Sequence, residues 1–198
     1  EIKSFLQSGF QVNRFKQAYG FKTLRTQDPA EVMRRIWAAP TFEVHGLVGG
    51  YHGPGVKTVV PGHGELKVSM RLVPNQTPEK AFALLKKHVA KLNPEVTVDR
   101  EGMLHPFRGV FDGPYVDAVQ RAVEAGFGKE PAFIREGGSI GAVVTMQKAW
   151  KVPILFMGLS LPEHGYHAPN EYFDWGQASG GMKAFVHYFA ELAKMGKR

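Results

Sequence analysis

Two connections in this sequence carry side chains that could bind a ligand. The first is Arg135-Glu136-Gly137-Gly138-Ser139, where the glycines let the backbone approach a ligand closely and Ser139 can cap the helix expected to follow. Free N–H groups at such a turn, with the helix dipole behind them, favour binding of a carboxylate or a phosphate. A tight strand-to-helix turn with nothing bound explains the same residues equally well.

The second connection, residues 161–172, places two imidazoles and two carboxylates close together. They belong to Glu163, His164, His167 and Glu171. Loops after strands of α/β sheets are common ligand sites, and His is the usual metal ligand where Cys is absent. The alternative is a pair of surface histidines, with Glu171 bonding neighbouring backbone.

Arg71, Thr58 and His105 are further candidates in the first half of the chain. Arg71 lies on the polar face of a predicted strand, and Thr58 lies on the strand predicted before it. An Arg in this position could clamp a carboxylate with two parallel hydrogen bonds, although an ordinary solvated sheet face is the alternative. His105 lies at the expected domain junction, where clefts form.

Composition narrows the classes of protein that could use these residues. The 198 residues are 43% hydrophobic and 22% charged, which suits a globular protein rather than a disordered or membrane-spanning one. With no Cys, disulfide scaffolds, zinc fingers and thiol nucleophiles are excluded. The net charge of +7 permits nucleic-acid binding, but no aromatic side chains alternate with the basic ones, so we expect no nucleic-acid partner.

The first half of the chain predicts part of a ferredoxin-like layer. The expected elements are an amphipathic helix over 1–21, a helix from Pro29 ended by Pro40, strands over 41–48 and 65–72, a helix over 78–92 and a strand over 95–100. These match a βαββαβ unit that lacks one strand and one helix at its front.

The second half predicts parallel strands with helical crossovers. Helices over 114–125, 140–150 and 174–195 alternate with strands over 132–135 and 152–157. We therefore predict an α/β protein with an α+β first domain over residues 1–103 and a second domain over 104–198.

Three ordered motifs resemble those of a known family. They are residues 55–61 followed by 71–78, residues 135–140, and residues 167–171. Together they resemble the dinuclear-zinc peptidases that include carnosine dipeptidases, succinyl-diaminopimelate desuccinylases, acetylornithine deacetylases and aminoacylases, and the dipeptidase branch most closely. The resemblance covers nearly the whole chain.

The resemblance implies a lid domain that also forms a homodimer, followed by the C-terminal part of a mostly parallel catalytic sheet. It implies that His167 is a metal ligand and that Gly138, Ser139 and Ile140 receive the substrate carboxylate. It assigns Arg71 to carboxylate binding, Thr58 to the neighbouring subunit's site, and His105 to a junction histidine. In this family two metal ions, zinc or alternatively cobalt or manganese, activate a water that attacks an amide bond.

This sequence also departs from the family pattern. The family's metal site needs a His-x-Asp motif and a Glu-Glu pair whose first member is the general base, and neither occurs here. Gly141 also replaces the usual proline after Ile140. One imidazole cannot hold a catalytic zinc that needs about three protein ligands. We therefore expect the C-terminal portion of a larger enzyme, without catalytic residues of its own and inactive alone.

The resulting hypothesis is part of a zinc-dependent dipeptidase or N-acyl amino acid hydrolase. A non-catalytic dimerisation or binding module is the alternative. No targeting signal or apolar stretch of membrane-spanning length is found, so we expect a cytoplasmic protein with small peptides as its substrates.

Overall fold

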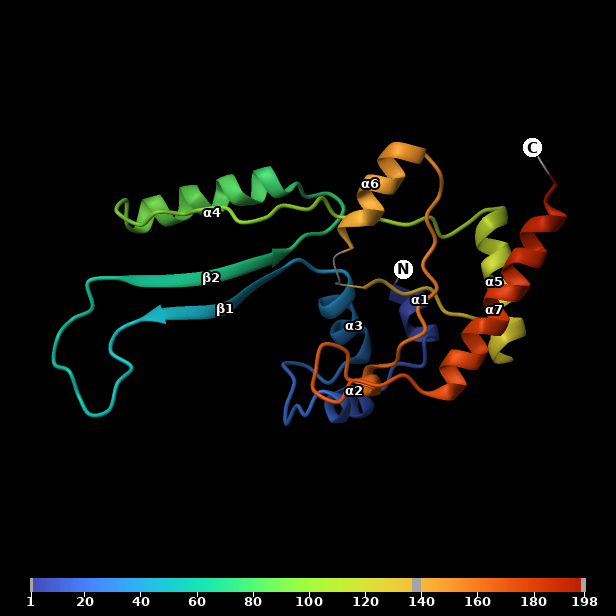
Figure 1. Ribbon diagram of the computed structural model, residues 1–198, viewed down its shortest axis with the longest axis horizontal. Helices are drawn as coiled ribbons and strands as arrows, with labels where there is room; N and C mark the ends of the chain where they lie inside the picture. Colours follow the sequence, from blue (N-terminus) through green and yellow to red (C-terminus); the bar gives the residue numbers. More distant parts are fainter. Residues whose placement is uncertain (1, 137–139, 197–198) are drawn as a thin grey trace. The chain divides into compact units, whose positions relative to one another are not determined.

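The computed structural model describes residues 2–136 and 140–196. Its elements in chain order are α1 (Ile2–Gln7), α2 (Val12–Ala18), α3 (Pro29–Trp37), β1 (Thr41–Gly49), β2 (Gly64–Arg71), α4 (Pro78–Leu92), α5 (Pro114–Phe127), α6 (Gly141–Trp150), the 3-10 turn η1 (Pro162–His164) and α7 (Trp175–Lys194) (Figure 1). Their contacts divide the chain into two compact units. We call residues 39–106 the ribbon unit, and residues 1–38 with 107–198 the helical unit.

The N-terminal segment of the helical unit differs from its prediction. The single helix expected over 1–21 is wrong, because α1 ends at Gln7 and α2 begins at Val12. Gly9 between them has a φ of 71°, a left-handed conformation that interrupts a right-handed helix. The break lets α1 pack on α3, where the rings of Phe5 and Trp37 meet edge to face with centroids 5.3 Å apart.

The helix predicted from Pro29 is confirmed. The Asp28 side chain accepts a hydrogen bond from the Ala30 N–H at 3.1 Å, and Pro29 occupies the first helical position. The Glu31 carboxylate accepts hydrogen bonds from Arg34 and Arg35 one turn later. Residues 1–38 group with the C-terminal part of the chain, and the contact of α2 with η1 is one reason.

The ribbon unit has the α+β composition that the sequence predicts. β1 and β2 pair antiparallel from Thr41 opposite Arg71 to Gly49 opposite Gly64, with an irregularity between Val44 and Gly46 (Figure 1). After β2, Thr77 caps α4 by accepting from the Lys80 N–H at 3.3 Å. The strand predicted over 65–72 and the helix over 78–92 are therefore confirmed.

The ribbon unit has little packed interior. Within the described ranges, Pro78 is its one fully buried residue, whereas Leu47 and Leu66 on the two strands are 78% and 56% exposed. An open apolar groove of about 520 Å³ separates the Thr41 end of the ribbon from α4. A two-stranded sheet is only marginally stable in water without a layer against it, so this unit depends on further contacts.

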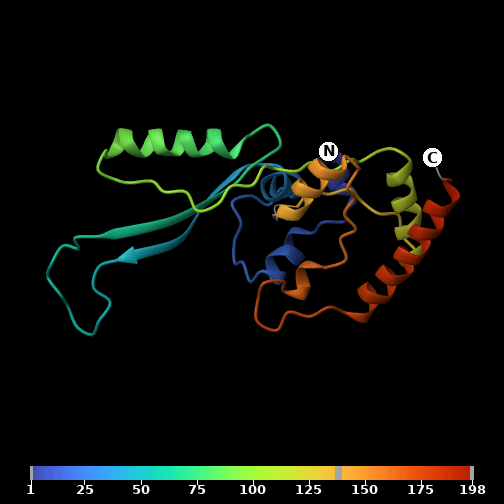
Figure 2. The ribbon, with the colours of Figure 1, turned by 45° about the horizontal axis from the view of Figure 1, so that its top comes forward.

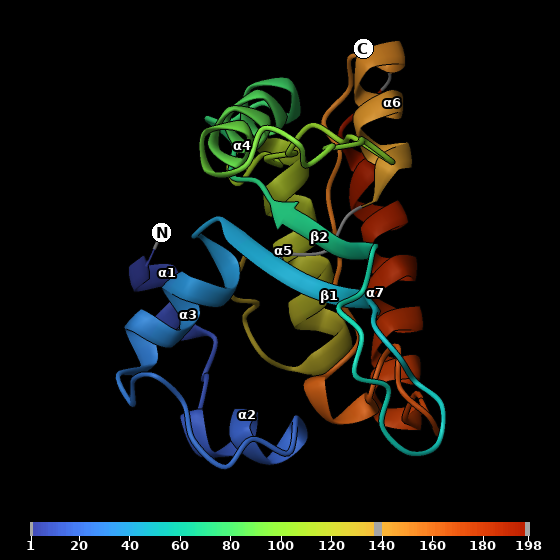
Figure 3. The ribbon, with the colours of Figure 1, turned by 90° about the vertical axis from the view of Figure 1, so that its left-hand side faces the viewer.

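The helical unit contains a close crossing of α5 and α7, which lie side by side in Figures 2 and 3. A Cβ on Gly126 would lie 2.5 Å from the carbonyl oxygen of Gly180 and 2.9 Å from the Cβ of Ala184. Small residues therefore let the two backbones approach each other. Arg121 of α5 and Glu191 of α7 add an ion pair of 2.7 Å.

Three predicted strands are absent from the described structure. Residues 95–100, 132–135 and 152–157 form neither helix nor strand there. A β-strand exists only when a neighbouring strand completes its ladder of hydrogen bonds, and the described residues offer these segments none. The helices that flank them are confirmed as α5, α6 and α7.

The chain leaves much apolar surface in contact with solvent. Its accessible area is 15246 Å² at a mass of 22.0 kDa. A compact monomer of this mass exposes about 9,300 Å², and two separate domains of half the mass expose about 11,200 Å². Part of the excess lies on α7, where four exposed residues form a stripe at helical spacing: Met182, Phe185, Val186 and Phe189.

Candidate active site

The loop over residues 161–172 is built around a buried histidine. His164 ends the turn η1, and its side chain is only 3% exposed. Its ring contacts those of Tyr172 and Phe173, with centroids 5.1 Å and 5.5 Å away. The reading of His164 as a surface histidine is therefore wrong, because two aromatic rings from the far end of the loop cover it.

Both ring nitrogens of His164 have hydrogen-bond partners. The Leu161 N–H donates to Nδ1 at 3.1 Å, and Nε2 lies 2.7 Å from Oδ2 of Asp174. Because Nδ1 accepts, the proton of the neutral ring lies on Nε2 and is donated to Asp174. The pKa of Asp174 is lowered below its usual range, mainly by the hydrogen bond from the Gln177 N–H at the start of α7. The hydrogen bond from the His164 imidazole is the next cause.

Two side chains near α2 contact the same loop. Arg14 forms an ion pair with Glu163, and this hydrogen bond lowers the pKa of the Glu163 carboxyl. The hydroxyl groups of Tyr19 and Tyr166 lie 2.9 Å apart. Burial, and then this hydrogen bond, raise the pKa of Tyr166 above its usual value. The loop is thus attached to α7 on one side and to the α2 segment on the other.

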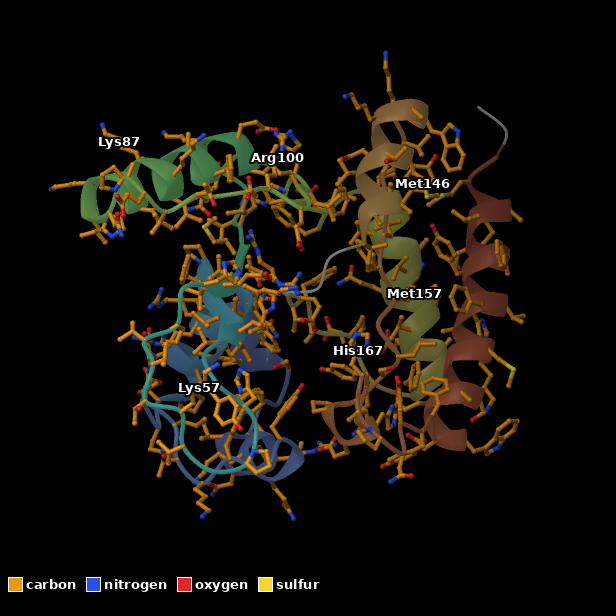
Figure 4. The ribbon with its side chains drawn as sticks, turned by 60° about the vertical axis from the view of Figure 1, so that its left-hand side comes forward. Lys57, Lys87, Arg100, Met146, Met157 and His167 are labelled. Carbon is orange, nitrogen blue, oxygen red and sulfur yellow. The ribbon has the colours of Figure 1, made fainter. Side chains whose placement is uncertain are left out.

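His167, the predicted metal ligand, lies in the middle of this loop with its side chain exposed (Figure 4). Its φ is 64°, in the left-handed region that non-glycine residues rarely adopt. Its N–H donates to Oε2 of Glu171 at 3.4 Å, so Glu171 does bond neighbouring backbone. The Tyr166 ring stands perpendicular to the imidazole, 6.3 Å away.

The predicted carboxylate-binding turn is described only in part. Gly138 and Ser139 lie outside the described residues. Ile140 precedes α6 as its N-cap, with a φ of −121° and its side chain 58% exposed. The roles of all three residues stay predictions.

The other predicted residues belong to the ribbon unit. The prediction that Thr58 lies on a strand is wrong, because Thr58 is exposed in the loop that joins β1 to β2. Arg71 ends β2 opposite Thr41. The His105 Nε2 lies 3.5 Å from a carboxylate oxygen of Glu79, at the start of α4. Thr58, Arg71 and His105 thus lie in the ribbon unit, whereas Ile140 and His167 lie in the helical unit.

The described residues do not by themselves form a metal site. Across 2–136 and 140–196, no three His, Asp or Glu side chains gather in a way that could hold an ion. His167 is one donor, and a catalytic zinc takes about three protein ligands. No catalytic step through a metal follows from this chain's own geometry.

Sequence reasoning missed the residues that hold the loop. The sequence predicts Asp174 only as the start of the last helix, and Arg14 and Tyr19 only as part of an amphipathic segment. An N-cap Asp needs one carboxylate oxygen for its helix, so Asp174 has another free for His164. This second carboxylate oxygen, ten residues after His164, is the one feature of the sequence that could have indicated the contact with His164.

Comparison with known proteins gives a consistent result. Residues 4–97 match the family described as the peptidase dimerisation domain. The Cys-Gly metallodipeptidase Dug1 of Schizosaccharomyces pombe is 32% identical over 186 residues, which are 91% of this chain and 39% of that protein. The human beta-Ala-His dipeptidase is 26% identical over 98% of this chain and 40% of its own length.

Solved structures agree with these relatives. Human carnosine dipeptidase 1 superposes with a TM-score of 0.85 at 26% identity, covering 98% of this chain and 42% of that structure. A metallo-carboxypeptidase of the M20 family from Sulfolobus solfataricus gives a TM-score of 0.84 at 28% identity, with 95% and 44% covered. This chain therefore spans about 40% of the length of the relatives it matches. No helix among the described residues is both long and apolar enough to cross a membrane.

Proposed function

Because this chain belongs to the M20 metallopeptidase family, we propose that it forms the dimerisation domain and the C-terminal catalytic segment of a metal-dependent dipeptidase. Residues 1–103 are assigned to the dimerisation domain and residues 104–198 to the catalytic segment. The observation that carries the proposal is the similarity to dipeptidases over 91% and 98% of this chain. Relatives named for Cys-Gly and for beta-Ala-His favour small dipeptides as substrates, with N-acyl amino acids as the alternative.

His167 is proposed as one ligand of a two-metal centre. Its exposed imidazole and its constrained backbone support this role. The remaining ligands and the general base would come from polypeptide outside residues 1–198, since the described residues supply too few donors. When bound, such metals supply an activated water. Zinc is the proposed metal, with cobalt or manganese as alternatives.

The substrate carboxylate is assigned to Arg71 and to the turn at Gly138, Ser139 and Ile140. The Arg71 guanidinium stands at the end of a strand, where its planar donor groups suit a carboxylate. His105 is assigned to the same substrate pocket.

A homodimer through the ribbon unit is proposed as the assembled state. Its loop over residues 50–63 exposes apolar side chains, with Val56 and Val60 90% and 89% exposed. Such side chains are favourable on a surface only when a partner covers them. Thr58 lies between them and would reach the neighbouring subunit's site.

The proposal is tested on the complete gene product that carries this sequence. His167→Ala should abolish metal-dependent hydrolysis of Cys-Gly and beta-Ala-His and lower the bound metal, measured by elemental analysis. His187→Ala, which removes an exposed imidazole of α7, is the matched control and should change neither. Full activity of the His167→Ala variant would contradict the proposal.

A second experiment separates this function from a non-catalytic module. Residues 1–198 alone, with zinc, cobalt or manganese, should hydrolyse neither dipeptides nor N-acyl amino acids. Metal-dependent turnover by this species would show that the site has been assigned wrongly. If the complete gene product is also inactive and binds no metal, the dimerisation module is the better description.

A further inference from the structure

The loop that carries His167 adopts a conformation that needs support from outside it. Gly165, His167 and Asn170 have φ values of 64°, 64° and 62°. For His and Asn, such left-handed backbone costs energy, on the order of 1–3 kcal/mol for each residue. Such a conformation persists only where the surrounding structure holds it, so particular contacts must stabilise this loop.

His164 is the residue at which the loop closes. Its carbonyl oxygen accepts the N–H of Tyr172 at 3.1 Å, so residues 165–171 leave and return at one point. Its ring is buried against Tyr172 and Phe173. The backbone and the side chain of this one residue therefore both fix the base of the loop.

Asp174 connects this base to the longest helix of the described chain. Its Oδ1 accepts the Gln177 N–H at 2.9 Å, which caps α7, while Oδ2 receives the Nε2 proton of His164 at 2.7 Å. With Leu161 donating to Nδ1, the ring has one tautomer and one orientation. A carboxylate behind an imidazole holds the ring in place in this way.

We infer that His164 is a positioning residue, which, through its paired contacts with Leu161 and Asp174, holds residues 165–171 in the conformation that presents the His167 imidazole. The inference rests on the proposed function only for the role of His167. The conformation of the loop is measurable on the chain without metal or substrate.

The test replaces Asp174 by Asn in the full 198-residue chain. Asn is also a good N-cap, so α7 keeps its cap, but an amide N–H facing His164 opposes the Nε2 proton. Hydrogen exchange of the Ala168 and Tyr172 amides should accelerate at least tenfold, and the ¹⁵N shifts of the His164 ring should lose the pattern of a single tautomer. Asp28→Asn, at the cap of α3, is the matched control and should change neither readout.

Global destabilisation is distinguished by an internal reference. Exchange of the Ala122 amide, in the buried face of α5, reports on the helical unit as a whole. Acceleration confined to the loop supports the inference, whereas equal acceleration at Ala122, or none in the loop, overturns it. These readouts do not depend on metal, so a failure here leaves the His167→Ala test of the proposed function standing, and the reverse is also true.

Two substitutions of His164 separate its two contacts. His164→Gln keeps a donor near the Nε2 position, and His164→Asn keeps an acceptor near Nδ1. We expect Gln to preserve the attachment to Asp174 and Asn the bond from Leu161, with loop exchange faster than wild type in both. Wild-type exchange rates in both variants would overturn the inference.

Discussion

The loops over residues 50–63 and 161–172 each carry a residue assigned to the active site, but they are held very differently. In the first loop, two contacts are local: the Tyr51 hydroxyl donates to the Pro54 carbonyl at 2.9 Å, and Lys57 lies 6.0 Å from the Tyr51 ring centroid. In the second, contacts reach α7 and the α2 segment, which is about 150 residues away in sequence.

This difference separates two ways of presenting a functional side chain. Residues 161–172 are organised by the chain's own buried His164, so His167 has a defined backbone before any ligand binds. Residues 50–63 expose Val56 and Val60, which a partner could cover. The proposed metal ligand is therefore positioned by contacts within the chain, whereas the proposed dimer contact would be completed by a partner.

The largest expected effect comes from a substitution in the closely packed crossing of α5 and α7, which contrasts with the open loop over residues 50–63. Gly126→Ala should destabilise the helical unit by about 3 kcal/mol, because the added Cβ meets a backbone oxygen that cannot rotate away. Urea unfolding followed by circular dichroism measures this. Gly62→Ala in the open loop, where a Cβ meets nothing within 4 Å, is the control and should be neutral or slightly stabilising. Equal losses of stability at Gly126 and Gly62 would contradict the expected difference between the packed crossing and the open loop.

The next effect concerns the open loop. Val60→Asp should weaken self-association about 30-fold for each protomer that carries it, since covering a valine contributes about 2 kcal/mol. Sedimentation equilibrium gives the dimer dissociation constant, with Val152→Asp, at an exposed valine outside the ribbon unit, as the control. Unchanged association would mean that this loop does not contact the partner.

A smaller effect tests the contact between the α2 segment and the loop over residues 161–172. Arg14→Ala should cost about 0.5 kcal/mol at neutral pH, because the ion pair with Glu163 is partly exposed. The pKa of Glu163 is lowered in the folded state, so this stability is present above its unfolded pKa and is lost as pH falls through the folded one. Denaturation curves of both proteins should therefore converge in acid. A gap that persists below the folded pKa would argue against this ion pair.

The smallest effect concerns the pKa of Glu31, a carboxylate of α3 that lies outside both loops. Hydrogen bonds from Arg34 and then Arg35 lower the pKa of Glu31 to about 2. Its contribution to stability is present above about 4.5, the reference value, and is lost as pH falls toward 2. Side-chain ¹³C shifts across an acid titration measure the midpoint, and a midpoint near 4.5 would show that the α3 pairs do not form in solution.

Local chemistry explains which parts of the fold the sequence predicted. Asp28, Thr77 and Asp174 cap helices through N–H groups two or three residues away, so a short window of sequence suffices. The strands over 95–100, 132–135 and 152–157 could not be judged in this way, because a strand needs a partner that the window does not contain.

The same distinction holds for the candidate site. His167 and Glu171 could be singled out from residue type and spacing, and the structure places them in contact through the backbone of His167. The burial of His164 could not be predicted, because it depends on Tyr172, Phe173 and Asp174 folding back over it. The candidate site residues could be predicted from the sequence, but the residues that hold them in place could not.

The 15246 Å² of accessible surface has a calorimetric consequence. Unfolding raises heat capacity because it hydrates apolar groups, by roughly 2.4–3.0 kcal/mol/K for 198 residues of ordinary burial. In this chain, many of these groups are already hydrated while it is folded, including the stripe on α7. Its heat-capacity increment should fall well below that range, and its thermal transition should be broad. A partner that covers the stripe should raise the heat-capacity increment and sharpen the thermal transition.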